Sequence, residues 1–310
     1  MGCMVKNVGI VGYNKGNGHP FSFSAIINGY APSLITSAGW EVIRNYLDRR
    51  DLSEFGFGNI KVTHAWTQDP LTTKQLCKAC FIPNAITNIE DMCNEVDAVI
   101  IARDDFECHK SLSAHFLEKD IPVFIDKPLS VKEEELKYFT PFLMHGKLMS
   151  CSSMRFAREL DSYHSDPLIY GKLHLIRAAG PLSWVKYGIH LLEAIIPFYP
   201  SEPLSVLYHS STHDSYIIRF KDHTTLLVNT LGNLKVPFLI DFFGEKTHSQ
   251  TIINDNFSMF RRTLWHFFKS IETKKPEISP ASTLTLMKVL MAGTQSKAGK
   301  GEVYLDEIVI

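Results

Sequence analysis

The segment Ile121-Pro-Val-Phe-Ile-Asp-Lys-Pro-Leu-Ser130 indicates both the fold of this chain and the position of its site. Its apolar centre, Val123 to Ile125, predicts a buried strand. Lys127 follows the strand, and Pro128 favours an extended conformation for it, so the lysine should project from a fixed position. Open α/β sheets bind ligands just beyond the carboxyl ends of their strands. By itself the segment favours a solvated loop lysine after an ordinary strand, and the rest of the chain shifts the preference to a functional lysine.

The rest of the first half repeats this alternation of strands and helices. Apolar runs at residues 7–12, 60–66 and 96–102 predict strands, and the patterns at 71–80 and 109–119 predict helices. Strands that alternate with helices in this way are typical of a parallel sheet covered on both faces. The predicted fold class of this half is α/β, a Rossmann doubly wound parallel sheet.

The connection between the first two strands, residues 28–60, is unusually long. Apolar residues recur in it at helical spacing and predict one added helix before Arg49. These residues are Trp40, Val42, Ile43, Tyr46 and Leu47.

A glycine-rich turn follows the first strand and precedes a predicted helix. Dinucleotide-binding turns need glycine because the backbone must approach the pyrophosphate closely, with the amides of the helix start facing the anion. Asn14 and Asn17 occupy the second and third glycine positions of GxGxxG, and asparagine tolerates left-handed conformations better than most residues. A turn of no special purpose remains the alternative. The residues expected to contact a dinucleotide here are Gly12, Asn14, Gly16, Gly18, His19 and Pro20, with His19 fixing the loop.

Further cofactor contacts are expected where later strands end at the same sheet edge. Thr67 stands where NAD-binding sites often carry an acid for the ribose hydroxyls, and Asp69 lies two residues later, so NAD and NADP both stay open. The imidazole of His109 also fits a packing or capping role. The residues added to the expected cofactor site are Thr67, Gln68, Asp69, Asp104, His109, Asp126 and Lys127.

The second half predicts a different kind of sheet. Residues 172–178 alternate partially, and strand candidates follow at 204–209, 215–220, 224–230, 236–243 and 247–253. Helices are predicted at 187–198, at 257–272 and from about 278 onward. We expect an α+β C-terminal domain with a large, mostly antiparallel open sheet at residues 128–310, after a dinucleotide-binding domain at residues 1–127.

Composition limits the classes of function. The 310 residues are 45% hydrophobic and 21% charged, with 32 basic and 33 acidic residues and a net charge of −1. No long basic run suits a nucleic acid or a membrane surface. The six cysteines are sparse, and Cys77 and Cys80 have metal-ligand spacing without a second pair, so buried thiols and no metal site are expected. The absence of a signal peptide and of a membrane-length apolar run predicts a cytoplasmic protein.

In their order along the chain, these motifs resemble the glucose–fructose oxidoreductase/inositol dehydrogenase/MocA (Gfo/Idh/MocA) family of NAD(P)-dependent oxidoreductases. Asp126-Lys127-Pro128 looks like the family's Glu-Lys-Pro, and Ser152-Ser-Met-Arg-Phe156 resembles the strand that opens the second domain. Tyr187-Gly-Ile-His190 with Glu193 resembles the family's Gly-x-His-x-x-Asp helix. Many members carry an aspartate four residues before the histidine, where this chain has Lys186. The usual catalytic trio is then incomplete, which leaves the reaction open.

The resemblance implies that Lys127 and His190 line a substrate pocket beside the nicotinamide of NAD or NADP. Imidazole titrates near neutral pH, so His190 is the expected acid/base, and Lys127 is expected to orient and polarise the substrate oxygen. Lys186 and Tyr187 are expected to assist catalysis, and Arg155 to bind substrate with Lys127 and His190. The expected reaction is hydride transfer on a carbinol or ketone of a sugar, cyclitol or nucleotide-linked sugar, in a homo-oligomer. A cofactor-binding sensor without turnover, or an NAD-assisted elimination or hydrolysis, are the alternatives.

Overall fold

The computed structural model describes residues 5–310. Residues 1–4 lie outside the described residues, and with them Cys3 and the start of the chain considered above for a signal peptide. The described chain forms two compact units, which are treated separately. The first contains residues up to Ser130, Tyr138–Cys151 and Phe260–Pro280; the second contains Val131–Lys137, Ser152–Met259 and Ala281–Ile310.

Among the described residues, the first unit is built on a six-stranded sheet with the order β3-β2-β1-β4-β5-β6, in which every pairing is parallel. The prediction of a parallel, doubly wound sheet is thereby confirmed. Its strands are β1 (Asn7–Val11), β2 (Lys61–Trp66), β3 (Asn84–Ala85), β4 (Ala98–Ile101), β5 (Val123–Asp126) and β6 (Leu148–Cys151). Its main helices are α1 (His19–Asn28), α4 (Pro70–Ala79) and α5 (His109–Leu117), while α6 (Glu133–Met144) and α9 (Asn256–Thr273) are shared with the second unit.

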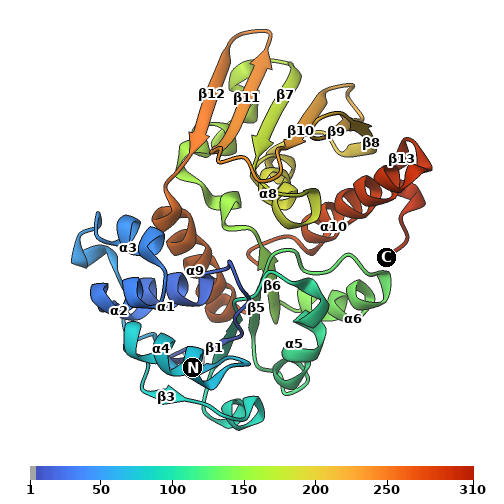
Figure 1. Cartoon of the computed structure of the whole chain (residues 1–310). Coiled ribbons are helices and arrows are strands. Elements are labelled where there is room, and N and C mark those ends of the chain that lie inside the picture. Colours follow the sequence, from blue (N-terminus) through green and yellow to red (C-terminus); the bar gives the residue numbers. More distant parts are fainter. Residues whose placement is uncertain (1–4) are drawn as a thin grey trace. The chain divides into compact units, whose positions relative to one another are not determined.

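Aromatic side chains fill one face of this sheet. Phe23 of α1 meets Phe124 of β5 with ring centroids 5.9 Å apart, and Phe124 meets Phe267 of α9 at the same distance. Figure 1 shows α1 and α9 on one side of β5 and α5 on the other. All four residues of β5 are buried, as expected of a strand covered on both faces.

The long connection contains two short helices instead of the single helix predicted. α2 (Pro32–Ser37) precedes α3 (Glu41–Leu47), and a 3-10 turn at Leu52–Glu54 follows them. The sequence pattern missed α2 because Ile35 is its only buried residue. Trp40 and Ile43 pack so closely on Gly18 that a Cβ atom there would lie 2.5 Å from the Cδ1 atom of Ile43.

Among the described residues, the second unit contains a seven-stranded sheet with the order β12-β11-β7-β10-β9-β8-β13. Only the pairing of β7 with β10 is parallel, so the prediction of a large, mostly antiparallel sheet is confirmed. Its strands are β7 (Leu173–Gly180), β8 (Pro203–Ser210), β9 (Asp214–Phe220), β10 (Thr225–Thr230), β11 (Phe238–Gly244), β12 (His248–Ile253) and β13 (Val303–Tyr304). Its helices are α7 (Asp161–Ser165), α8 (Ile189–Ile195) and α10 (Pro280–Gln295). Pro280, the first residue of α10, belongs to the first unit.

Helices cover one face of the second sheet. The Trp184 ring stacks on Tyr216 of β9 at 3.9 Å, and its indole nitrogen donates to the Leu290 carbonyl of α10. Tyr163 of α7 packs on Phe242 of β11 at 4.4 Å. The contacts of Trp184 anchor the segment before α8, and α8 carries His190.

The segment Ser152–Phe156 is not a strand, contrary to the likeness described above. Residues Ser153–Phe156 form a 3-10 turn, because the Ser152 hydroxyl accepts from the Met154 amide and caps it. The strand in this region is β6, just before it, and β6 pairs with β5 of the first sheet.

The two compact units are not separated at one position in the sequence, since β6 and part of α9 belong to the first unit. The boundary between residues 127 and 128 stays a prediction. Cys77 and Cys80 are free and buried, and burial raises the pKa of the Cys77 thiol to about 11. None of the helices within residues 5–310 has the length and apolar character needed to cross a bilayer.

Candidate functional site

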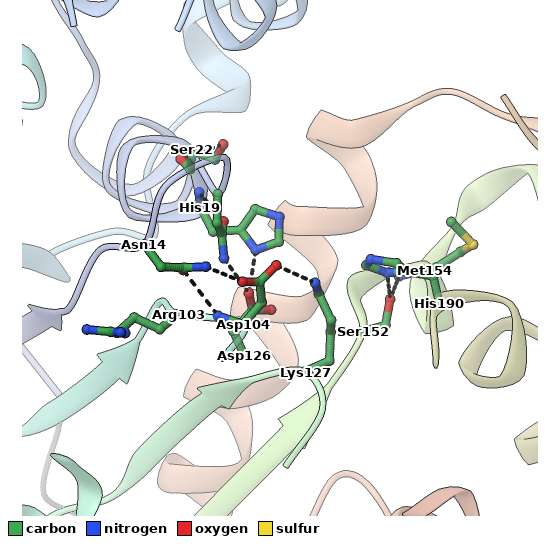
Figure 2. A network of polar contacts seen from close by, with 12 residues as sticks. Asn14, His19, Ser22, Arg103, Asp104, Asp126, Lys127, Ser152, Met154 and His190 are labelled. Atoms are coloured by element: carbon green, nitrogen blue, oxygen red, sulfur yellow. Dashed lines mark hydrogen bonds and ion pairs between the residues drawn. The ribbon is translucent and has the colours of Figure 1, made fainter. Parts of the chain in front are cut away.

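In the first unit, Lys127 lies in a buried ion pair at the carboxyl end of β5. Its Nζ atom is 3.3 Å from the Oδ2 atom of Asp104, which follows β4. The exposed fractions of the two residues are 2% and 8%. Lys127 is therefore held in place at the sheet edge predicted to bind a ligand, and it is not a solvated loop lysine. Figure 2 shows this pair with its neighbours.

The glycine-rich turn is tied to the same two strand ends by its two asparagines. The Asn14 amide donates to Asp104 Oδ1 at 2.5 Å, and the Asn17 amide donates to Asp126 Oδ2 at 3.3 Å. His19 also contacts Asp126, with 2.6 Å between Nδ1 and Oδ2. The asparagines at the second and third glycine positions therefore crosslink the turn to the ends of β4 and β5. Figure 2 shows the contact between Asn14 and Asp104.

The backbone of this turn fits an anion. The amides of Lys15, Gly16 and Gly18 make no hydrogen bond within residues 5–310. Gly16 has φ of +88°, and no atom lies within 4 Å of the position its Cβ would take, so this side of the turn is open. Gly12 has φ of +86° and lies against the Arg103 side chain. Unbonded amides in a glycine-rich turn are the donors that a pyrophosphate requires, so the residues present fit a dinucleotide.

Helix α1 itself contributes little to such an anion site. The His19 amide donates to Asn17 Oδ1, and Pro20 has no amide hydrogen. The amides of Phe21 and Ser22 both donate to the Gly18 carbonyl. The amides that could donate to an anion are therefore those of the turn. The sequence analysis expected the amides at the start of the helix to face the anion.

The end of β2 is organised by side chains that also hold the helix after it. Asp69 caps α4 by accepting from the amides of Leu71 and Thr72, and the Thr72 hydroxyl lowers the pKa of Asp69. Thr67 is buried and contacts the Thr73 hydroxyl at 2.7 Å. Gln68 accepts from the Tyr13 amide at 3.0 Å and so links this loop to the glycine turn.

His109 connects the loops that follow β4 and β5. Its side chain is fully buried, and its two ring nitrogens each lie 3.0 Å from a backbone carbonyl, one of Leu129 and one of Arg103. The Lys127–Pro128 peptide bond between these loops is cis. His109 therefore fixes the backbone on either side of the ion pair, which agrees with the packing role considered for it.

In the second unit, His190 lies in the first turn of α8. Its Nδ1 atom is 2.6 Å from the Oγ atom of Ser152. The imidazole contacts Tyr187 and Phe238 edge to face, with ring centroids 5.1 and 5.3 Å away. The ring is therefore oriented by one hydroxyl and two aromatic side chains.

Lys186 and Tyr187 lie in the π-helical turn Trp184–Gly188 that leads into α8. Tyr187 stacks on Phe238, with ring centroids 5.8 Å apart. Lys186 lines an open hollow of about 500 Å³ in the second unit. The polar side chains around this hollow are those of Ser183, Lys186, Thr212, His213, Asp214, Thr230 and Asn233.

Arg155 forms a second buried ion pair. Its Nε atom lies 2.6 Å from Glu193 Oε2, and it also donates to the Ser282 hydroxyl. Burial raises the pKa of Glu193, and the charge of Arg155 opposes part of that rise. The guanidinium thus fixes α8 to the turn Ser153–Phe156 and to α10; its predicted contact with substrate stays a prediction.

Ser152 and Phe238 orient His190 but were not predicted, because each comes from a segment distant in the sequence. Asp104 was predicted only as a cofactor contact, and its pairing with Lys127 requires knowing that β4 and β5 are neighbours. A serine directly after a buried apolar strand was the only local signal for Ser152.

Residues 35–140 match the family described as "Oxidoreductase family, NAD-binding Rossmann fold", the Gfo/Idh/MocA family. The match covers residues 35–140, about a third of the chain. The resemblance stated from the motifs is thereby confirmed, as is a nicotinamide dinucleotide as the cofactor of the family. None of the curated proteins is similar enough in sequence to match the chain.

Solved structures extend the similarity in fold beyond the Gfo/Idh/MocA segment. Apo scyllo-inositol dehydrogenase from Lactobacillus casei has a TM-score of 0.75 at 15% identity, covering 99% of this chain and 100% of that one. A probable dehydrogenase from Thermotoga maritima has a TM-score of 0.76 at 13% identity, covering 98% and 100%. Myo-inositol dehydrogenase from L. casei, solved with NAD(H) and myo-inositol, has a TM-score of 0.74 at 12% identity, covering 97% of both chains. At these identities the comparison establishes the fold.

Proposed function

We propose that the protein is an NAD-dependent dehydrogenase or reductase that acts on a carbinol or ketone of a sugar, cyclitol or nucleotide-linked sugar. The main support for the proposal is that Lys127 is buried at the carboxyl edge of the first sheet, the edge that also carries the open glycine turn. Family membership supports the dinucleotide, and inositol dehydrogenases among the similar structures support a polyhydroxylated substrate.

NAD is the preferred cofactor in this proposal. The turn Thr67-Gln-Asp-Pro70 after β2 carries no lysine or arginine that could pair with a 2′-phosphate. Asp69 is exposed, so its carboxylate can cap α4 and still accept from ribose hydroxyls. The turn amides of Lys15, Gly16 and Gly18 hold the pyrophosphate.

The nicotinamide, when bound, accepts or supplies the hydride. Within the chain, His190 exchanges the hydroxyl proton of the substrate at Nε2, while Nδ1 stays on Ser152. A serine hydroxyl can either donate or accept. Ser152 therefore supports the tautomer in which His190 is a base and the one in which it is an acid. Lys127 donates to the substrate oxygen and stabilises the negative charge that develops there.

Arg155 has a positioning role in this mechanism, since its ion pair with Glu193 fixes the helix that carries His190. Around the hollow beside Lys186, hydroxyl, amide and imidazole groups suit a substrate with several hydroxyls.

Native mass spectrometry of the purified protein tests the cofactor, because a retained NAD adds its mass to the chain. Absorbance of reduced cofactor at 340 nm is then followed with a panel of sugars, cyclitols and nucleotide-linked sugars. Net formation or consumption of NADH supports the dehydrogenase. Product without net change would assign the protein to redox-assisted elimination or hydrolysis, and binding without turnover would make it a sensor.

A further inference from the structure

Asp104 and Lys127 form a buried ion pair within the first unit. They follow neighbouring strands, β4 and β5, and lie 3.3 Å apart with little exposure to solvent. Taking a charge out of water is costly unless an opposite charge compensates it. The carboxylate of Asp104 therefore holds the buried lysine in position.

The carboxylate is itself fixed by the glycine turn. Asn14 donates to Asp104 Oδ1, and the Asp104 amide lies 3.4 Å from the Asn14 Oδ1 atom. Oδ2, the other carboxylate oxygen, contacts Lys127. A continuous hydrogen-bonded series thus runs from the turn, through Asn14 and Asp104, to the ammonium group (Figure 2).

The neighbouring Asp105 differs in what it contacts. Its carboxylate pairs with Arg103, and the exposed fraction of its side chain is 35%. Two adjacent aspartates on one loop therefore have separate partners, and only Asp104 faces the lysine. This offers a matched control on the same segment.

We propose that Asp104 is a positioning residue that keeps Lys127 charged and oriented, and that links the lysine to the occupancy of the glycine turn. The catalytic part of this role rests on the proposed function. The effect on the protonation of Lys127 does not.

The first test measures protonation without requiring activity. The protein is labelled with 15N at the lysine side chains, and the Lys127 resonance is assigned by its loss in Lys127→Ala. Its titration is followed with pH in the wild type, Asp104→Asn and Asp105→Asn. Asp104→Asn should move the midpoint to lower pH, because the ammonium loses its counterion, while Asp105→Asn should leave it unchanged. An unchanged midpoint in Asp104→Asn would overturn the proposal.

The second test uses the enzyme with NAD and the best substrate. Asp104→Asn should lower kcat by about a hundredfold, since a small displacement of a reacting group has an effect of that size. The Kd for NADH, from its fluorescence, should stay within about threefold of wild type, and Asp105→Asn should behave as wild type. Equal losses of kcat in both variants would contradict a specific role.

Asp104→Glu is the second variant, needed if Asp104→Asn does not fold. It keeps the charge but displaces the carboxylate, so kcat should fall while the midpoint of Lys127 stays near that of the wild type. Wild-type kcat in Asp104→Glu would overturn the positioning role. If no substrate reacts with the wild type but the midpoint moves in Asp104→Asn, the proposed function fails and the link between Asp104 and Lys127 stands.

Discussion

The Oγ atom of Ser152 lies 2.6 Å from the Nδ1 atom of His190, and the same oxygen accepts from the Met154 amide. One hydroxyl therefore both caps a turn and orients the imidazole proposed to exchange the substrate proton.

Replacing Ser152 by alanine should lower kcat roughly tenfold, because the lost hydrogen bond amounts to about 1.4 kcal/mol at the transition state. The Kd for NADH should not change, since Ser152 lies in the second unit. Steady-state kinetics and NADH fluorescence measure the two quantities. Ser153→Ala, next along the chain, is the control and should retain activity. Equal kcat in Ser152→Ala and the wild type would remove Ser152 from the mechanism.

Lys127→Ala should abolish turnover and leave the affinity for the cofactor nearly intact. It removes the group that stabilises charge on the substrate oxygen but none of the turn amides. It should also lower the free energy of unfolding by about 3–5 kcal/mol, because the buried carboxylate of Asp104 loses its partner. Single-turnover kinetics and urea unfolding measure these effects. Lys132→Ala removes a more exposed ion pair with Glu135 and is the control. Normal turnover in Lys127→Ala would show that the proposed role is wrong.

Glu193→Gln replaces the carboxyl group that faces Arg155 by a neutral isostere of the protonated acid, so its effect on the stability of the second unit should depend on pH. Glu202→Gln, which removes only an exposed pair with Lys221, should have little effect.

The stability of the wild type relative to Glu193→Gln should fall as pH rises. The pKa of Glu193 is raised in the folded protein, so the folded state holds this proton more tightly than the unfolded chain. The stability that this group contributes is fully present below the ordinary glutamate pKa of 4.5 and is lost as pH rises through the folded value. The wild type should therefore be most stable relative to Glu193→Gln at low pH. Urea unfolding of both proteins from pH 4 upward measures the difference in their free energies of unfolding, and a wild type that gains stability over Glu193→Gln as pH rises would contradict the assignment.

Asp69→Ser separates two roles of one side chain. Serine also caps helices well, so α4 should be retained and the melting temperature should stay near that of the wild type. The ribose loses a carboxylate acceptor, so the Kd for NADH should rise about tenfold. Fluorescence titration checks this. A Kd equal to that of the wild type would restrict Asp69 to capping α4 and would leave the ribose to other groups.

Local sequence patterns predicted the elements whose own residues determine them. The apolar run before Lys127 and the helical spacing around His190 were sufficient to place both residues at the ends of the correct elements. Ser152–Phe156 was expected to be a strand because of its likeness to the family, but the Ser152 hydroxyl caps a 3-10 turn there. α2 was missed because so little of it is buried.

Pairings between distant segments could not be predicted in this way. That Asn14 meets Asp104, or that Ser152 meets His190, depends on which strands are neighbours and how the chain returns to the sheet. The crosslinking role of Asn14 and Asn17 was likewise hidden, because a glycine pattern says nothing about the side chains that replace glycine.

The first sheet is completed by residues that the ribosome makes long after its first five strands. Phe124 is covered by Phe267, and β5 is paired on its outer edge by β6, so neither is complete when residue 130 has been synthesised. A nascent chain stopped there would present an apolar sheet face and an open strand edge to solvent or to a chaperone. The nucleotide-binding half can therefore finish folding only after the chain has been made through α9, near residue 273.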